Sequence, residues 1–346
     1  MAKINFYTID KTEKEAIFKA ASIKAGLSAF AVEKDWWVTQ TLAIIFEMEV
    51  AHHMVFKGGT SLSKVWKLIE RFSEDIDLAI DRSYFGFTGE LTKKQKTELR
   101  KAASKFTSGT FLEQLKTKFD DKGYSGVNLN LIEASDSDQD PRIIELTYPN
   151  IIVPFSDYLE PKILIEIGCR SLREPFAFQS INSMIDDIYK ENDFATSGID
   201  VPTVIPERTF LEKIFLLSEE FQRPIAKMRV DRLSRHLYDI YYLSKTDIAD
   251  RAISNKDLYE TIVTHRYKYA KVGGVNYNGH NPKTINPLPI PEVIEAWNTD
   301  YKRMLEEMIY GKNAPTFEML IDNLQELRAR LSEVEWEFSI KFPGID

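Results

Sequence analysis

The sequence predicts an α+β protein of two domains, with helices and strands mixed in residues 1–204 and helices dominating residues 205–346. Three short runs between Ser125 and Ile167 alternate apolar and polar residues, the period of a β-strand. Beyond residue 205 the apolar residues recur at helical spacing. The segment FATSGIDVPTVIP between these regions is rich in Pro, Gly and small residues, which favours a domain boundary there.

Composition excludes several classes of protein. The chain has 346 residues, 43% of them hydrophobic and 28% charged, as in ordinary globular proteins. It starts without an apolar signal segment, and no apolar run approaches the length of a membrane span, so we expect a cytoplasmic protein with no membrane partner. Its one cysteine, Cys169, excludes a disulfide framework, and its five scattered histidines do not favour a zinc hydrolase. A net charge of −8 means that any nucleic acid must bind a local basic patch.

Two helices are expected before the first strand. One is capped by Asp10 or Thr12 and ends at Gly26, and the next begins at Ser28 and continues through VEKDWWVTQTLAIIFEME. Asp35, near the start of the second helix, could point into a site, but its spacing favours a solvated helix face.

A glycine-rich turn follows the apolar run Met54–Phe56 and precedes a helical pattern from Leu62 to about Phe72. The turn contains Gly58, Gly59, Thr60 and Ser61. Exposed backbone N–H groups at a helix start favour phosphate. The alternative is a simple tight turn in which Thr60 or Ser61 caps the helix.

Asp75 and Asp77 lie in the alternating run that comes next. On a strand they share one face, roughly 6–7 Å apart, while Ile76, Leu78 and Ile80 take the other. Two carboxylates at this spacing can bind Mg²⁺ together with substrate phosphates. Although an acidic strand face can be merely solvated, its combination with the preceding turn predicts metal-dependent chemistry on a nucleoside triphosphate (NTP).

Further candidates come from the middle of the chain. A strongly basic helix is the best local candidate for contacting a polyanion, and its cations are Lys93, Lys94, Lys96, Arg100, Lys101 and Lys105. In the strand KILIEIG, Glu166 is a third candidate metal ligand, because a carboxylate in so apolar a strand needs a partner. The alternative partner is a salt bridge with Arg170 or Arg173.

The C-terminal half offers two more charged candidates. Lys213 borders the apolar stripe of PERTFLEKIFLLSEEFQ, where it can extend to solvent or reach a triphosphate. Asp239 lies among aromatic residues, with Arg232 and Arg235 near it on the same predicted helix. The basic and aromatic residues 265–281 are expected to form an irregular surface loop, and a last helix is expected from Phe317 to about Phe338.

The segment FKGGTSLSKVWKLIERFSEDIDLAI resembles the signature segment of the AbiEii (MenT-like) nucleotidyltransferase toxins, which belong to the DNA polymerase β-type nucleotidyltransferase superfamily. VEKDWWVTQTL upstream, and LEKIFLL and RLSRHLYDIYYL downstream, are similar to other recurring segments of the family, so the resemblance covers most of residues 30–245. It implies a nucleotidyltransferase core, with a mixed sheet flanked by helices, and a C-terminal helical domain.

The resemblance also implies roles for the candidate residues. Asp75, Asp77 and Glu166 would bind Mg²⁺, for which Mn²⁺ is a possible substitute, and the turn Gly58–Ser61 would bind the NTP phosphates. Lys213 would neutralise the triphosphate, and Asp239 would be the essential acid of the helical domain. The superfamily commonly has Gly-Ser directly, whereas this chain has Gly58-Gly59-Thr60-Ser61, so either hydroxyl remains a candidate for the phosphate contact.

Family members are toxins paired with AbiEi-like antitoxins, and some relatives transfer nucleotides to tRNA 3′ ends. The resemblance therefore implies a toxin that transfers NMP from an NTP to an RNA, with tRNA as the expected acceptor. Two alternatives stay open: a nucleotidyltransferase that modifies a protein or a small molecule, and a non-catalytic module that binds a nucleotide or a partner.

Overall fold

The computed structural model describes residues 4–73, 75–136, 139–153, 160–309 and 313–343. The chain forms two compact units. The first contains residues 1–65 and 72–204, and the second contains residues 66–71 and 205–346. The short segment 66–71 thus groups with the second unit, although it precedes the domain boundary predicted near residue 205.

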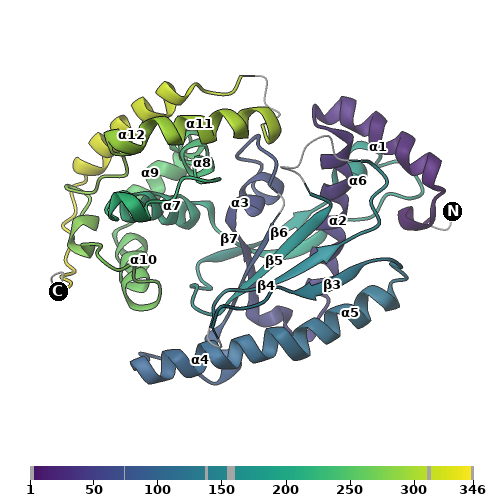
Figure 1. Ribbon diagram of the computed structural model, residues 1–346, viewed down its shortest axis with the longest axis horizontal. Coiled ribbons are helices and arrows are strands. Elements are labelled where there is room, and N and C mark those ends of the chain that lie inside the picture. The colour runs from purple at the N-terminus through teal and green to yellow at the C-terminus, as the bar shows by residue number, and fades with distance from the viewer. Residues whose placement is uncertain (1–3, 74, 137–138, 154–159, 310–312, 344–346) are drawn as a thin grey trace. The chain divides into compact units, whose positions relative to one another are not determined.

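A seven-stranded mixed sheet forms the centre of the first unit (Figure 1). The strand order is β3-β4-β5-β2-β1-β7-β6. The β5–β2 and β1–β7 pairs are parallel and the other neighbours are antiparallel. The strands span β1 (Met54–Lys57), β2 (Ile76–Ile80), β3 (Asn128–Leu131), β4 (Arg142–Thr147), β5 (Lys162–Gly168), β6 (Phe176–Ile181) and β7 (Ile199–Val204).

One face of the central strands forms core, because their apolar residues alternate with polar ones. Ile76 and Leu78 of β2 are fully buried and pair with Ile165 and Ile167 of β5. The residues between them on each strand point to the opposite face. The predicted alternation in KILIEIG and in the Asp75–Ile80 run therefore matches the observed burial, with β2 itself beginning one residue after Asp75.

The first unit also contains helices. Helices α1, α2 and α6 pack against one another, and α5 lies beside β3 (Figure 1). Gly26, with φ +69°, ends α1 as predicted, and Ser28 caps α2. The helices are α1 (Lys11–Ala25), α2 (Ala29–Phe46), α3 (Gly58–Thr60), α4 (Lys93–Phe106), α5 (Leu112–Asp121) and α6 (Met184–Ile188).

The regular structure described in the second unit is helical. Helix α7 begins with Pro206 in its first turn, where a missing N–H costs nothing. Its apolar face packs on α8, α9 and α10. The helices are α7 (Pro206–Glu220), α8 (Arg235–Ser244), α9 (Asp247–Ser254), α10 (Lys256–Tyr269), α11 (Pro291–Glu307) and α12 (Phe317–Ser332). No helix in the described part of the chain is long and apolar enough to cross a membrane.

Several predicted elements were wrong in detail. The helix expected to reach Phe72 ends at Val65, after a π-helical turn over Ser61–Val65, and Lys67 has a positive φ of 53°. Strand β7 lies inside FATSGIDVPTVIP, where the sequence had predicted a domain boundary and no strand. Residues 265–269 belong to α10 rather than to a loop. The last helix stops at Ser332 instead of Phe338.

Candidate active site

Asp77 and Glu166 are direct neighbours across the sheet. They are register partners on the parallel strands β2 and β5, so their Cα atoms lie about 4.8 Å apart and their side chains share a face. Lys57, at the end of β1, is the antiparallel partner of Asp77 and adds a cation to the same face. The buried Ile76, Leu78, Ile165 and Ile167 occupy the opposite face, which leaves the carboxylates clear of the core.

The glycine-rich turn adjoins this acidic face. Gly58 has a φ of +82°, a conformation that side chains rarely adopt. A β-carbon at position 58 would fall 1.9 Å from Oδ2 of Asp77 and 2.8 Å from its Cγ. Gly58 is therefore required both for its backbone angle and for the close approach of the Asp77 carboxylate. The structure brings the predicted phosphate turn and the predicted metal ligand together.

The two hydroxyls of the turn hold the segment in shape. Oγ1 of Thr60 donates to the backbone oxygen of Asp75 at 2.5 Å and lies 2.9 Å from Oγ of Ser73. Oγ of Ser61 donates to the backbone oxygen of Gly58 at 2.8 Å. Both residues are buried. Thr60 thus ties the turn to the residue that precedes β2, which fixes the position of Asp75 relative to the turn.

Asp35 supports the same region from α2. The sequence predicted a solvated helix face for it, but Asp35 is buried, so that prediction is wrong. Its Oδ1 accepts from Nζ of Lys64, in the π-helical turn, at 2.5 Å. Its Oδ2 accepts from the backbone N–H of Met184 at 2.7 Å. Asp35 therefore anchors the segment that follows Gly58–Ser61 to α2 and α6.

The two arginines suggested as partners of Glu166 also make other contacts. Nε of Arg170 donates to Oδ2 of Asp140 at 2.8 Å, and Arg173 donates to the backbone oxygen of His52 and to Glu174.

Cys169 is buried, as a small apolar residue would be, and burial raises the pKa of its thiol.

Lys213 and Asp239 meet in the second unit. Nζ of Lys213, on α7, lies 2.9 Å from Oδ2 of Asp239, on α8. Arg71 binds the same carboxylate with two hydrogen bonds, Nε to Oδ1 at 2.6 Å and Nη2 to Oδ2 at 2.8 Å. Asp239 is completely buried, and Arg71 is nearly so. The segment 66–71 groups with the second unit through this ion pair and through a β-bridge between Arg71 and Ile309.

Burial and charge set the protonation of this cluster. Burial opposes ionisation of Asp239, but Arg71 and Lys213 outweigh it and hold the pKa of that carboxyl below its usual value. Burial lowers the pKa of Lys213, against the attraction of Asp239. Burial, reinforced by Lys213, also holds the pKa of His236 well below its usual value. His236 is therefore neutral near pH 7, and its Nδ1 lies 3.2 Å from Nζ of Lys213, where it can accept a hydrogen bond.

Arg71, Asp35 and His236 were not predicted as members of these clusters. Arg71 and Asp239 are 168 positions apart, and nothing in a periodic pattern links them. The burial expected for Asp239 among aromatics was the one available signal, since a buried carboxylate requires a cation. The sequence suggested Arg232 and Arg235 for this role, both on the helix predicted to carry Asp239, rather than Arg71 and Lys213.

The acidic face suits a hard divalent cation, because carboxylate oxygens are the ligands that Mg²⁺ prefers. Within the described ranges, no group of three or more His, Cys, Asp and Glu side chains is arranged to hold a metal ion. Asp77 and Glu166 form a pair, and Mg²⁺ in nucleotide enzymes is commonly bound by one or two carboxylates with the substrate phosphates as further ligands. The residues present therefore fit a metal that binds together with its nucleotide.

Comparison with known proteins agrees with these features. Residues 41–323 match the family described as nucleotidyl transferase AbiEii toxin, type IV toxin–antitoxin system. The chain belongs to this family. It is a nucleotidyltransferase, and the matched region contains the turn, the three acids, Lys213 and Asp239.

Two solved structures align with most of the chain. MenT4, a nucleotidyltransferase toxin from Mycobacterium tuberculosis, aligns with a TM-score of 0.51 and 14% identity, over 93% of this chain and 90% of that one. JHP933 from Helicobacter pylori aligns with a TM-score of 0.39 and 13% identity, over 87% of this chain and 92% of that one. No protein of curated function matches the chain by sequence. The predicted α+β class, with its mixed sheet and C-terminal helices, is confirmed.

Proposed function

We propose that this AbiEii family member transfers NMP from an NTP to an RNA acceptor, expected to be tRNA, in a reaction that depends on Mg²⁺ or Mn²⁺. The observation that supports the proposal is the close approach of Gly58 to Asp77. It sets a glycine-rich turn beside a carboxylate whose strand neighbour is Glu166. A phosphate-binding turn next to paired carboxylates is what metal-dependent chemistry on a triphosphate requires.

We assign the roles as follows. Asp75, Asp77 and Glu166 hold the metal, and the turn of Gly58, Gly59, Thr60 and Ser61 binds the phosphates. Bound metal would supply the positive charge that activates the attacking hydroxyl and stabilises the departing pyrophosphate.

In the helical unit, Lys213 neutralises the triphosphate, and Asp239 positions the ammonium of Lys213. The ion pair at 2.9 Å and the fixed carboxylate of Asp239 support the positioning role.

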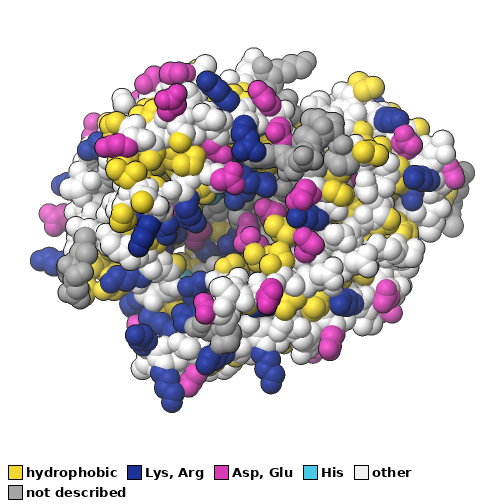
Figure 2. All heavy atoms as spheres, in the orientation of Figure 1, with side chains coloured by type: hydrophobic (Ala, Val, Ile, Leu, Met, Phe, Trp, Pro, Cys, Tyr) yellow, Lys and Arg dark blue, Asp and Glu magenta, His cyan; other side chains and the backbone are white. Residues whose placement is uncertain are grey.

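Helix α4 supports RNA as the acceptor. Figure 2 shows Lys and Arg side chains gathered over this helix. The helix contains six cationic residues and one acidic residue, Glu98. Most of the cationic side chains are exposed. In a chain of net charge −8, such a patch is the local feature that can attract a polyanion.

The test incubates the purified protein with each α-labelled NTP and Mg²⁺, with and without total tRNA. We expect label in RNA with the wild-type protein. We expect none with Asp75→Ala or Asp77→Ala, while circular dichroism shows that both variants remain folded. Repeating the assay with EDTA, and then with Mn²⁺, tests the metal requirement.

The other outcomes separate the alternatives. Wild-type labelling by either Asp variant would contradict the metal-ligand roles. Label found in protein or in a small molecule, and absent from RNA, would favour a different acceptor on the same core. Absence of pyrophosphate release with any acceptor would favour a non-catalytic nucleotide-binding module.

The toxin role predicts an AbiEi-like antitoxin as partner. A gene for a small winged-helix regulator immediately upstream would support it. Co-expression of that regulator should relieve growth arrest caused by this protein. Growth arrest that the regulator does not relieve would contradict the pairing.

A further inference from the structure

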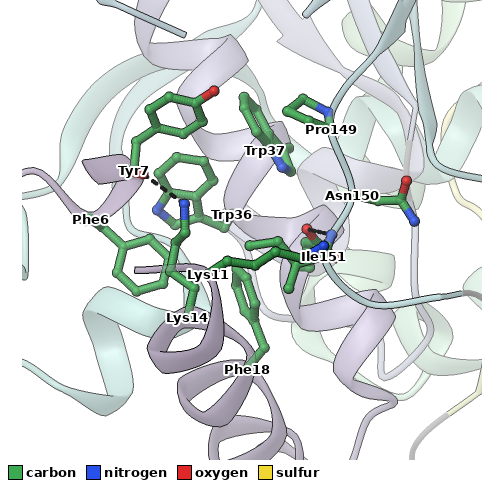
Figure 3. A pocket seen from close by; sticks show the side chains of 11 residues that line it. Phe6, Tyr7, Lys11, Lys14, Phe18, Trp36, Trp37, Pro149, Asn150 and Ile151 are labelled. Carbon is green, nitrogen blue, oxygen red and sulfur yellow. Dashed lines mark hydrogen bonds between the residues drawn. The ribbon is translucent and has the colours of Figure 1, made fainter. Parts of the chain in front are cut away.

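A cavity of about 220 Å³ lies in the first unit between α1, α2 and the segment that follows β4 (Figure 3). It is partly open to solvent, and several aromatic side chains line it, among them Phe6, Trp36 and Trp37. Concave pockets lined mostly by apolar and aromatic side chains are where proteins usually bind small ligands.

Aromatic rings form the walls of the cavity and brace one another. Phe6 meets Phe18 edge-on with centroids 5.5 Å apart, and Trp36 meets Trp37 edge-on at 4.9 Å. Tyr7 contacts both tryptophans, lying parallel to Trp36 and edge-on to Trp37. Because each ring is held by another, the walls are stiff and aromatic, which favours an aromatic ligand over a flexible chain.

Two lysines give the cavity a positive side. Lys11 and Lys14 are three residues apart on α1 and so lie on one face of that helix. Nζ of Lys14 donates to the backbone oxygen of Tyr7 at 2.7 Å and stands 4.9 Å from the centre of the Tyr7 ring. Lys14 is partly buried, and burial lowers the pKa of its ammonium. A partly desolvated ammonium with remaining N–H donors attracts an anionic group.

The acid in the cavity, Glu33, offsets only part of this charge. Glu33 is completely buried on α2 and accepts the backbone N–H groups of Ile151 at 2.7 Å and Ile152 at 2.8 Å, one on each carboxylate oxygen. Burial raises the pKa of Glu33 to about 7, while these hydrogen bonds and the attraction of Lys14 and Lys11 oppose the rise. One acid faces two lysines, so the cavity keeps a net positive charge.

The cavity is separate from the candidate active site. Trp37 stacks on Tyr148 with centroids 5.2 Å apart. Ile144 and Leu146 of β4 are buried, and Tyr148 follows them at the same two-residue spacing and is also buried. Its side chain therefore lies on the core face of the sheet. Asp77 and Glu166 project from the opposite face.

We propose that this cavity is a second binding site, for a small planar aromatic anion of one or two rings bearing a carboxylate or a phosphate. The rings contact Trp36, Trp37 and Phe6, and the anionic group pairs with Lys14 and Lys11. The volume is below the roughly 300–1,000 Å³ of drug-sized ligand pockets, which limits the ligand to about this size.

The experiment measures binding to the full-length protein by ligand-observed NMR. The probes are indole-3-carboxylate, neutral indole, AMP and inorganic phosphate. We expect indole-3-carboxylate or AMP to bind in the millimolar range or better, and more tightly than indole or phosphate alone. Binding of AMP without indole-3-carboxylate identifies a nucleotide ligand of the cavity if Lys14→Gln weakens it; AMP binding that Lys14→Gln leaves unchanged belongs to the active site and counts against the proposal. Binding of indole-3-carboxylate without AMP identifies an aromatic acid.

Variants locate the binding. Lys14→Gln, and separately Lys11→Gln, should weaken it by about tenfold, since each removes a charge-assisted hydrogen bond to the anionic group. Lys19→Gln, on the same helix but exposed and paired with Glu15, should leave it unchanged. The proposal is overturned if no aromatic anion binds, if indole or phosphate alone binds equally well, or if folded Lys11→Gln and Lys14→Gln variants bind as the wild type does.

Discussion

Asp77 lies so close to Gly58 that a β-carbon at position 58 would fall 1.9 Å from Oδ2 of the carboxylate. Gly58→Ala must therefore push the Asp77 side chain out of its position. If Asp77 is a metal ligand, we expect transfer activity to fall by about 100-fold, the usual effect of misplacing a reacting group by about 1 Å. The measurement is the rate of labelled-nucleotide transfer.

Gly86→Ala is the matched control for this variant. Gly86 has nearly the same backbone angle, φ +79°, but no atom lies within 4 Å of its would-be β-carbon. It should lose about 1–2 kcal/mol of stability from the left-handed conformation and keep its activity. Equal activity of folded Gly58→Ala and Gly86→Ala proteins would show that the contact with Asp77 has no part in the reaction.

The sequence predicted the strands near this site well, but not the closeness of Gly58 to Asp77. Strands with strict alternation, such as KILIEIG, were placed correctly because burial on one face leaves a clear period. The closeness of Gly58 to Asp77 follows from the pairing of β1 with β2, which joins Lys57 to Asp77. That pairing is a tertiary contact, so local spacing could suggest two neighbouring motifs but not their distance.

Other parts could not be predicted for a related reason. Strand β7 contains Pro202 and follows Gly198, so its local composition favours a turn, while antiparallel pairing with β6 and a parallel pair with β1 make it a strand. Residues 66–71 have helical spacing, but the buried pair of Arg71 with Asp239 holds them elsewhere. In both cases a long-range contact overrides a local preference.

The buried cluster around Asp239 predicts a large stability effect. Asp239→Ala leaves the guanidinium of Arg71 and the ammonium of Lys213 buried without their shared carboxylate. We expect the free energy of unfolding to fall by about 3–5 kcal/mol. Urea denaturation monitored by circular dichroism measures it.

Asp250→Ala is the control for Asp239→Ala. Asp250 also binds an arginine, Arg330, at 2.7 Å, but its side chain is 74% exposed. Exposed pairs contribute about 0–1 kcal/mol. A similar small loss in both variants would mean that Asp239 does not stabilise the cluster as the geometry indicates.

The basic helix α4 predicts a selective loss of RNA labelling. Lys94→Glu combined with Lys101→Glu changes the charge of this patch by four units, and both side chains are exposed. If α4 binds the acceptor, the KM for tRNA should rise and the salt dependence of binding should weaken, because fewer counterions are released. The KM for the NTP should stay the same.

A charge-matched control separates a local patch from net charge. Lys283→Glu combined with Lys302→Glu makes the same change at exposed positions in the second unit. We expect this protein to label tRNA as the wild type does. Equal losses in the two double variants would point to overall charge and contradict a specific role for α4.

Glu33 predicts a pH dependence of stability. Burial raises the pKa of Glu33 to about 7 in the folded protein, against 4.5 for the free group. Between these two values the folded state binds more protons than the unfolded state, so its stability falls as pH rises through this window, by at most about 1.4 kcal/mol per pH unit. Glu33→Gln removes the titration. We therefore expect the difference in unfolding free energy, wild type minus Glu33→Gln, to decrease from pH 4.5 to 7.

The difference in unfolding free energy between wild type and Glu15→Gln should change with pH in the opposite direction. The hydrogen bond from Lys19 lowers the pKa of Glu15, so the stability that Glu15 contributes is present at neutral pH and is lost as pH falls through the folded pKa. Denaturation curves of wild type and both variants at matched pH values measure the two differences. A Glu33→Gln difference that is flat across the window would mean that Glu33 keeps its ordinary pKa, and that the hydrogen bonds from Ile152 and Ile151, together with Lys14 and Lys11, stabilise its charged form as much as burial opposes it.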